Sequence, residues 1–206
     1  MSKPTLLLIG AGGHAKSCID VIEQEDKFQI IGLVGSPNEV STHVLGYEVL
    51  GTDDALSELL NMTQYALVAV GQVGTNDLRS DLFFKIANIG FISPVVISPL
   101  AYVSPHAVVG KGTVVMHRAT INAGARIGDN CIINSHALIE HDVVVEDHCH
   151  IATSTTINGG STVGKSGFVG SGTIIRESIT IGQSCSIGMG ISVRHDLPPN
   201  SQFAGE

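Results

Sequence analysis

The sequence contains no tryptophan, few aromatic residues, and only 11 lysines and arginines against 19 aspartates and glutamates. A net charge of −8 disfavours a nucleic-acid-binding surface or a general affinity for anionic membranes. The four cysteines lack any zinc-binding spacing, and no apolar run is long enough for a secretory signal or a membrane span. We therefore expect a cytoplasmic protein that neither inserts into membranes nor binds nucleic acid.

Glycine, in contrast, is abundant, with 24 copies in 206 residues, and hydrophobic residues make up 43% of the chain. Only 15% of the residues are charged, and this composition argues against disorder. A chain that is rich in glycine and aliphatic residues but poor in aromatics is typical of repeat architectures.

Residues 1–92 are predicted to form a domain in which strands and helices alternate. The predicted strands are short apolar runs at residues 5–9, 28–34 and 65–70. The predicted helices lie at residues 14–25, just after residue 52, and at 76–89. Thr52 is expected to cap the second helix. One face of the third is expected to carry Leu78, Leu82, Ile86 and Ile89. This alternation predicts a Rossmann-like α/β domain, a small parallel sheet with helices on its faces.

Residues 93–206 follow a different pattern, in which every sixth position from Ile97 to Val193 is valine or isoleucine. The residue two positions earlier is usually small, and the residue directly after is often glycine, which we expect to permit a tight turn. Each hexapeptide then forms one short strand and one turn, with the aliphatic side chain inside. Three such hexapeptides close one triangular coil. The pattern predicts a parallel β-helix with coils about 4.8 Å apart, whose core includes Cys131, Cys149 and Cys185.

Three motifs of the chain resemble those of one enzyme family. They read Gly10-Ala-Gly12-Gly13-His14-Ala15-Lys16, Ile139-Glu140-His141-Asp142 followed by His150, and Asn158-Gly159-Gly160. Together they resemble the hexapeptide-repeat sugar acetyltransferases of the PglD/NeuD type, which act in the bacillosamine and sialic acid pathways. The resemblance covers most of the chain and implies a left-handed β-helix, a homotrimer with active sites between its copies, and acetyl-CoA as co-substrate. It also implies N-acetylation of a UDP-linked 4-amino-4,6-dideoxy-N-acetylhexosamine without a metal.

His141 is the candidate general base, because it lies two residues after an inward-facing isoleucine and therefore points outward at a coil corner. A neutral imidazole has a suitable pKa for taking a proton near neutral pH. The adjacent Asp142 can hold the tautomer of this imidazole, a role that the family gives to an acidic residue there. Gly159 follows His141 by three hexapeptides, so we expect it one coil along on the same corner. The resemblance makes its N–H the oxyanion donor.

The resemblance assigns further residues to the two substrates. His150 is expected to face the thioester end of acetyl-CoA, and a subunit interface could lie between it and His141. Ser171 and Met189 are also separated by three hexapeptides, so they are expected to stack on one edge. In the family this column lines the pantetheine groove. Asn134 is expected to contact the acceptor.

The glycine-rich segment at Gly12, Gly13 and His14 follows a predicted strand and precedes a predicted helix. This arrangement presents backbone N–H groups to phosphate. Gly71, after the third predicted strand, is expected to belong to the same crevice. We expect a nucleotide-sugar to bind there, with its sugar reaching a groove of the coil.

The end of the second predicted strand lacks the acid that NAD sites usually carry. It reads Val34-Gly35-Ser36-Pro37, which counts against NAD. It also departs from family relatives, which carry an acidic pair there to contact the nucleotide. Gly35 and Ser36 are still expected to line the nucleotide site.

Three other functions stay open. O-acetylation of sialic acid or another sugar would use the same base. A zinc hydratase of the γ-carbonic-anhydrase type also uses a trimeric hexapeptide coil, and His136 and His141 have its histidine spacing. Leu100, however, stands at the position of its third ligand. A non-catalytic nucleotide-sugar-binding scaffold would be expected to lack a base with an acidic neighbour, which this chain has at His141 and Asp142.

Overall fold

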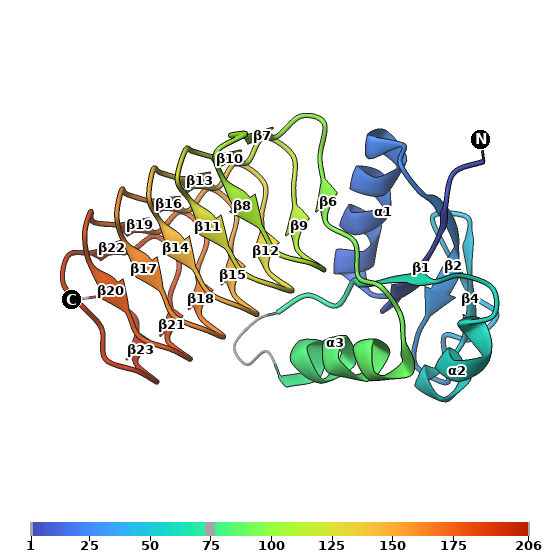
Figure 1. The fold of residues 1–206 in the computed structure, drawn as a ribbon. Helices are drawn as coiled ribbons and strands as arrows, with labels where there is room; N and C mark the ends of the chain where they lie inside the picture. The colour runs from blue at the N-terminus through green and yellow to red at the C-terminus, as the bar shows by residue number, and fades with distance from the viewer. Residues whose placement is uncertain (1, 73–76, 206) are drawn as a thin grey trace. The chain divides into compact units, whose positions relative to one another are not determined.

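A computed structural model describes residues 2–72 and 77–205, and these residues form two compact units. The first unit contains the described residues up to Gly71 and those from Asp77 to Val96. The second contains Gln72 and the described chain from Ile97 onward, so the boundary between the units falls within the strand Val96–Ile97. The first unit combines strands and helices, whereas the second consists of stacked coils of strands (Figure 1).

The first unit is built on a five-stranded sheet. Its elements are β1 (Thr5–Ile9), α1 (Gly13–Glu25), β2 (Gln29–Val34), β3 (His43–Val44), β4 (Tyr47–Gly51), the 3₁₀ helix η1 (Asp53–Ala55), α2 (Leu56–Leu59), β5 (Tyr65–Val68) and α3 (Asp77–Ile89). The strand order is β3-β4-β2-β1-β5, with β3 antiparallel to β4 and all other pairs parallel. The chain runs from β1 to β2 on one side and later crosses to β5 on the other. The strand order therefore reverses between β1 and β5, the usual place of a ligand crevice in such sheets.

Both faces of this sheet are covered, as parallel sheets require. Leu7 and Ile9 of β1 share a buried cluster with residues of α2 and α3, whereas the buried residues of α1 lie outside that cluster. Successive side chains of a strand point to opposite faces, so Leu6 and Leu8 point toward the other face, which α1 covers. The predicted strand–helix alternation is confirmed.

Two local predictions in this unit are wrong. Leu78 is exposed, because the buried face of α3 begins one residue later, and its members are Arg79, Leu82, Phe83 and Ile86. Thr52 occupies the position before η1, but its side chain makes no capping hydrogen bond. Its carbonyl instead accepts the N–H of Ala55. Residue 76, where the predicted helix begins, lies outside the described residues.

The second unit is a parallel β-helix of two-residue strands, as predicted. Its strands are β6 (Val96–Ile97), β7 (Tyr102–Val103), β8 (Val108–Val109), β9 (Val114–Val115), β10 (Thr120–Ile121), β11 (Arg126–Ile127), β12 (Ile132–Ile133), β13 (Leu138–Ile139), β14 (Val144–Val145), β15 (His150–Ile151), β16 (Thr156–Ile157), β17 (Thr162–Val163), β18 (Phe168–Val169), β19 (Ile174–Ile175), β20 (Thr180–Ile181), β21 (Ser186–Ile187), β22 (Ser192–Val193) and β23 (Gln202–Phe203). They form three parallel sheets, one along each side of the coil. Ile139 pairs with Ile121 on one side and Ile157 on the other, so residues that are three hexapeptides apart stack.

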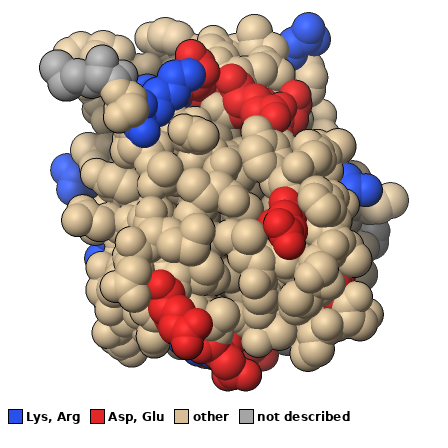
Figure 2. All heavy atoms as spheres, turned by 90° about the vertical axis from the view of Figure 1, so that its right-hand side faces the viewer, with Lys and Arg blue, Asp and Glu red and all other residues tan. Residues whose placement is uncertain are grey.

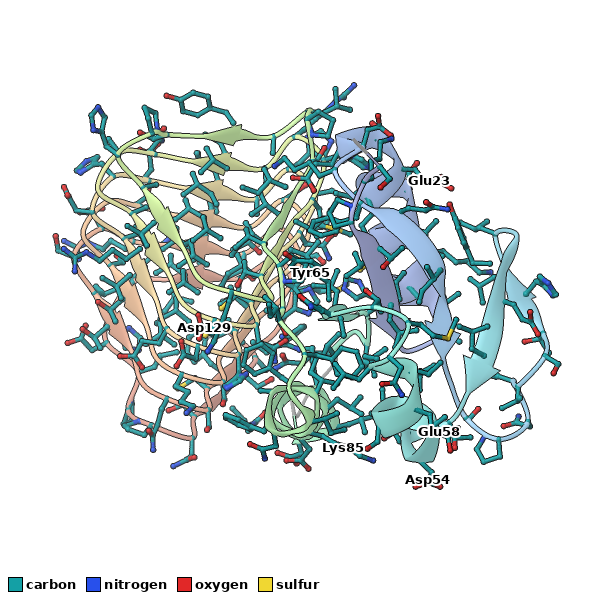
Figure 3. All side chains as sticks on the ribbon, turned by 45° about the vertical axis from the view of Figure 1, so that its right-hand side comes forward. Glu23, Asp54, Glu58, Tyr65, Lys85 and Asp129 are labelled. Atoms are coloured by element: carbon teal, nitrogen blue, oxygen red, sulfur yellow. The ribbon has the colours of Figure 1, made fainter. Side chains whose placement is uncertain are left out.

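The interior of the β-helix holds the sixth-position aliphatic residues, which pack into one continuous cluster (Figure 3). Cys131, Cys149 and Cys185 belong to this cluster and are fully buried, which confirms that they fill the core. Small hydroxyl residues at equivalent positions satisfy backbone groups inside the coil. Thr155 Oγ1, for example, donates to the Gly170 carbonyl at 3.1 Å.

We predicted that the glycine after each inward-facing residue permits a tight turn, and this prediction is wrong. These glycines do not have a positive φ. They are needed because adjacent coils approach closely, since a Cβ on Gly164 would lie 2.6 Å from the backbone N of Gln183. The left-handed conformation falls two residues later in the turn. There it is adopted by glycine, as at Gly112 and Gly172, and by short polar residues, as at Asn130 and Asp142.

The surface charge is sparse. Figure 2 shows one face of the protein, on which acidic side chains gather in separate groups and basic side chains are scattered. The ion pair of Lys85 on α3 with Asp53 of η1, for example, is exposed, and its Nζ and Oδ2 lie 3.4 Å apart. Among the described helices, none has the length and apolar character needed to cross a bilayer.

Candidate active site

His141 and Asp142 form the turn between β13 and β14. His141 Nδ1 lies 2.9 Å from Asp142 Oδ2, and the two side chains are 67% and 72% exposed. Asp142 has a φ of 61°, a left-handed conformation that aspartate tolerates better than most residues. One coil earlier, Gly124 leaves room for the carboxylate, because a Cβ on it would collide with Asp142 Oδ1. The turn therefore presents a paired imidazole and carboxylate to solvent, as predicted for an outward-facing corner.

The electrostatic surroundings of His141 favour its protonated form. The hydrogen bond with Asp142 raises the pKa of the imidazole above its ordinary value of 6.5. Desolvation partly offsets this effect, and the negative charges of Asp142 and Glu140 reinforce it. When Nδ1–H donates to the carboxylate, the lone pair of the neutral ring is on Nε2. Nε2 is therefore the atom that can accept a proton from a reacting group.

Gly159 lies directly against this imidazole. A Cβ on Gly159 would lie 2.7 Å from both Cε1 and Nε2 of His141. The Gly160 N–H donates to the His141 carbonyl at 3.0 Å, which sets the two turns in register. Among the described residues, the Gly159 N–H donates to no acceptor. The structure thus brings together a basic nitrogen and an unpartnered backbone donor.

His150 lies on a strand rather than at a coil corner. Its Nδ1 is 2.9 Å from the Gln72 carbonyl, and its Nε2 is 3.2 Å from Nδ2 of Asn134. Its ring meets Phe168 edge to face, with centroids 5.4 Å apart, and the residue is only 8% exposed. These partners indicate that Nδ1 carries the proton and Nε2 accepts. The structure therefore joins His150 and Asn134, which the sequence assigned to different substrates.

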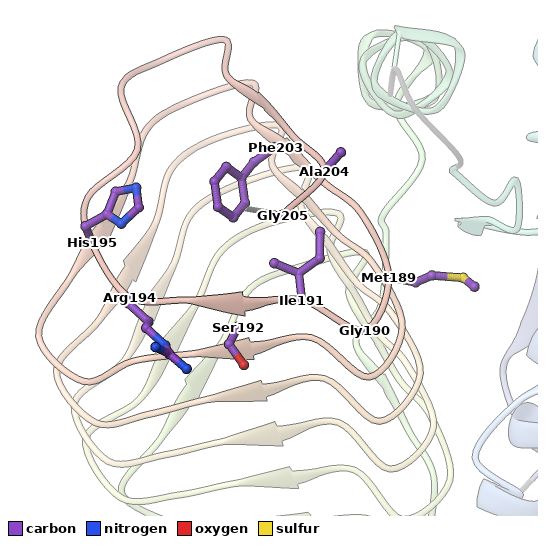
Figure 4. Close-up of a pocket in the computed structure, with 9 residues that line it drawn as sticks. All are labelled: Met189, Gly190, Ile191, Ser192, Arg194, His195, Phe203, Ala204 and Gly205. Atoms are coloured by element: carbon purple, nitrogen blue, oxygen red, sulfur yellow. The ribbon is translucent and has the colours of Figure 1, made fainter.

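Ser171 and Met189 are stacked on one corner, as predicted, since the Gly190 N–H donates to the Ser171 carbonyl at 2.8 Å. Met189 is 77% exposed. It borders a pocket of about 490 Å³ at the last coils, whose wall also includes Arg194, His195 and Phe203 (Figure 4). Within one copy of the chain, a strand separates this corner from the corner that carries His141. The two groups of predicted residues are therefore not brought together in one chain.

The glycine-rich segment of the first unit forms the open N-terminus of α1. Gly12 is the residue before the helix, and the first turn contains no acidic residue. A Cβ on Gly12 or Gly13 would meet no atom within 4 Å, so the space above these residues is open. A Cβ on Gly71 would lie 3.3 Å from the Cβ of His14. The structure thus brings Gly71 to this segment, at the point where the strand order reverses.

Sequence reasoning missed one acidic residue near this segment. Glu39 folds back to the end of β2, where its Oε2 accepts the Ser36 N–H at 2.8 Å and lies 2.5 Å from Ser36 Oγ. Because Gly35 has no side chain, the Glu39 carboxylate and Ala11 can both lie close to its Cα. A Cβ there would lie 2.9 Å from Glu39 Oε2 and 3.2 Å from the Ala11 Cβ. The available signal was the Ser-x-x-Glu pattern at 36–39, which is typical of a glutamate that binds a preceding backbone N–H.

The two histidines with zinc-hydratase spacing do not form a cluster. His136 follows β12 and His141 follows β13, so they occupy successive corners of the coil. In the part of the chain that the structure describes, no three His, Cys, Asp or Glu residues are arranged to hold a metal ion.

Two family models match the chain. The model of the PglD N-terminal domain matches residues 5–86. The model of the bacterial transferase hexapeptide, which contains six repeats, matches residues 106–141 and 124–159. The matches fall on the α/β unit and on the β-helix, respectively.

Solved structures extend this similarity to the whole chain. PerB from Caulobacter crescentus, in complex with CoA and GDP-perosamine, is 34% identical, and the match covers 100% of this chain and 95% of PerB with a TM-score of 0.91. This chain belongs to the PglD/NeuD-type acetyltransferases. The acetyltransferase domain of PglB from Neisseria gonorrhoeae, in complex with acetyl coenzyme A, is 30% identical over 100% of this chain and 97% of that domain, with a TM-score of 0.90. The coil of this PglD/NeuD-type protein is accordingly a left-handed β-helix.

One curated protein also matches this PglD/NeuD-type chain. The uncharacterized protein L142 of Acanthamoeba polyphaga mimivirus is 31% identical over 108 residues. That match includes 52% of this chain and only 20% of the viral protein, so the chain spans about a fifth of the length of this relative.

Proposed function

We propose that this protein is an acetyl-CoA-dependent N-acetyltransferase that acts on a nucleotide-linked amino sugar. Its relatives support the proposal, since PerB is in complex with CoA and GDP-perosamine and the PglB domain with acetyl coenzyme A. The observation that carries it is the contact between His141 and Gly159. A proton acceptor and an unpartnered N–H in contact are the two groups that acyl transfer from a thioester needs.

In the proposed reaction, the amine of the acceptor attacks the thioester carbonyl carbon in a ternary complex. His141 Nε2 takes the proton that the amine loses, and Asp142 stabilises the resulting imidazolium. The Gly159 N–H donates to the carbonyl oxygen as it becomes an oxyanion. The C–S bond then breaks, and the CoA thiolate leaves with the proton held by His141. An N-acetylated sugar and free CoA are the products.

The proposed acceptor is a 4-amino-4,6-dideoxy sugar linked to a nucleoside diphosphate. The open N-terminus of α1, at Gly12 and Gly13, supports binding of the diphosphate, because its backbone N–H groups and helix dipole attract anions. The sequence resemblance points to UDP, whereas PerB is in complex with GDP-perosamine. UDP- and GDP-linked sugars are therefore the two acceptors to compare.

Binding of acetyl-CoA is proposed to require neighbouring copies of the chain. His150, Ser171 and Met189 are the residues proposed to contact it, and they lie away from the His141 corner of the same chain. A homotrimer with its coils side by side would place the corner of one copy against the face of another. Sedimentation analysis with and without acetyl-CoA tests this arrangement.

The deciding experiment measures acetyl transfer from acetyl-CoA to UDP- and GDP-linked 4-amino sugars, with the product identified by NMR. The wild-type protein should form an N-acetyl product. His141→Ala should lower kcat by roughly 10²- to 10⁴-fold, the range for loss of a general base, while CoA binding is retained. His106→Ala, an exposed histidine at the same corner two coils earlier, is the matched control. A near-normal rate for His141→Ala, or an O-acetyl product, would contradict the proposal.

A further inference from the structure

Glu39 lies where a nucleotide-binding βαβ unit places the acid that holds a ribose. In such units the phosphates bind at the glycine segment after the first strand, and an acid after the second strand accepts a hydrogen bond from the ribose 2′-hydroxyl. A point beside Gly35, at the end of β2, is 2.9 Å from Glu39 Oε2 and 3.2 Å from the Cβ of Ala11 in the glycine segment. The carboxylate and Ala11 of the glycine segment therefore lie close to each other, on either side of Gly35.

One oxygen of the Glu39 carboxylate accepts no hydrogen bond from the described residues. Both contacts from Ser36 are made to Oε2, whereas Oε1 has no hydrogen-bond partner among the described residues. Hydrogen bonds from the side chain and backbone of Ser36 lower the pKa of Glu39. The group is therefore an ionised acceptor at neutral pH, which suits a free hydroxyl and repels a phosphate.

We propose that Glu39 is a specificity-determining residue that accepts a hydrogen bond from the ribose 2′-hydroxyl of the nucleotide-sugar. The protein then uses ribonucleotide-linked amino sugars and discriminates against 2′-deoxyribonucleotide-linked ones such as dTDP-sugars. This inference rests on the proposed function, because it requires a nucleotide bound to the first unit.

A purely structural role for Glu39 makes a different prediction. The Glu39 N–H donates to the Ser36 carbonyl at 2.9 Å, so the residue also closes the turn at 36–39. If Glu39 served only this turn, its loss would weaken ribose and deoxyribose substrates equally. The ratio of the two activities therefore separates the two roles.

The test uses a UDP-linked 4-amino sugar and its 2′-deoxyuridine counterpart, which differ by one hydroxyl group, with the equivalent GDP-linked pair in parallel. For the wild-type protein, kcat/KM should favour the ribose substrate by roughly 10- to 100-fold, as for one hydrogen bond to a charged group. Glu39→Ala should lower kcat/KM for the ribose substrate by a similar factor and leave the deoxyribose substrate nearly unchanged. The ratio should therefore fall toward one.

A wild-type ratio near one overturns the proposal, and so does a ratio that survives Glu39→Ala. Should the alanine variant unfold, Glu39→Gln keeps a side chain that can accept the Ser36 N–H, and it should keep the Tm while lowering the ribose preference. Calorimetric binding of UDP and 2′-deoxy-UDP decides the same question without catalysis. Absence of acetyl transfer by the wild-type protein to any of these acceptors would instead reject the proposed function, while the binding ratio would still decide the role of Glu39.

Discussion

The imidazole of His141 lies against the backbone of Gly159, one coil further along the β-helix, so closely that a Cβ would be 2.7 Å from Nε2. The Gly160 N–H holds this offset by donating to the His141 carbonyl at 3.0 Å. The proposed base and oxyanion donor are thus positioned by the same coil-to-coil hydrogen bonds that hold the fold. The geometry of the proposed site follows from the repeat itself.

Gly159→Ala should displace the imidazole while the coil stays folded. Gly159 does not have a positive φ, and Ala123 occupies the same corner position two coils earlier, so the turn accepts alanine. The new methyl group would occupy the space of the His141 ring, and a displacement of about 1 Å costs roughly 10²-fold in rate. We expect kcat to fall by about that factor, with the Tm and the acceptor KM little changed. A normal kcat in steady-state assays would show that Gly159 has no part in the reaction.

The pH dependence of kcat/KM should report the pairing of His141 with Asp142. Below its pKa the imidazole is protonated and cannot act as a base, and the Asp142 hydrogen bond raises that pKa. The acidic limb of the wild-type profile should therefore lie above the ordinary histidine value of 6.5.

Asp142→Asn should move this limb to lower pH, because it removes the negative charge. Asparagine tolerates the left-handed conformation of position 142, so the turn is retained. Glu140→Gln is the matched comparison, and it should give a smaller shift, since Glu140 is the weaker of the two influences. A limb that stays in place in Asp142→Asn would exclude His141 as the group that titrates.

The β-helix could be predicted in detail because its period is carried by one kind of residue. Val and Ile at every sixth position fix both the inward face and the stacking of Ile121, Ile139 and Ile157. The roles of the glycines could not be predicted in the same way, because glycine is required for two different structural reasons. Close approach of backbones requires Gly164, whereas a positive φ favours Gly172. A sequence alone does not separate these causes.

The candidate site was predictable only where it follows the period. The contact of His141 with Gly159 follows from their separation by one full coil of the repeat. The hydrogen bond between Asn134 and His150 joins positions that are not a whole coil apart, so it runs diagonally between coils. The six-residue period of the sequence therefore does not predict it. The position of Glu39 was not predicted, because its carboxylate reaches the end of β2 from a turn rather than from the strand.

Asn134→Ala should act through His150. The amide of Asn134 donates to His150 Nε2 at 3.2 Å, and its oxygen accepts the Ser135 N–H at 2.8 Å. Loss of this donor leaves the buried imidazole free to change tautomer or turn. We expect the KM for acetyl-CoA to rise about tenfold, the scale of one lost neutral hydrogen bond.

The matching double variant tests the coupling directly. If Asn134 acts only by holding His150, Asn134→Ala should add nothing in a His150→Ala background. Additive effects on the KM for acetyl-CoA would instead show that Asn134 contacts a substrate independently.

Gly164→Ala should destabilise the β-helix even though its backbone conformation suits alanine. A Cβ there would lie 2.6 Å from the Gln183 backbone N and 2.9 Å from the Gly182 carbonyl carbon, so adjacent coils must separate. Overpacking of this kind costs about 1–3 kcal/mol. Gly172→Asn is the matched control, because a Cβ at Gly172 meets nothing within 4 Å and Asn130 adopts the same left-handed conformation. Denaturant unfolding should therefore show a clear decrease in the free energy of unfolding for Gly164→Ala and almost none for Gly172→Asn. Equal decreases in the two variants would mean that the spacing between coils does not require glycine at position 164.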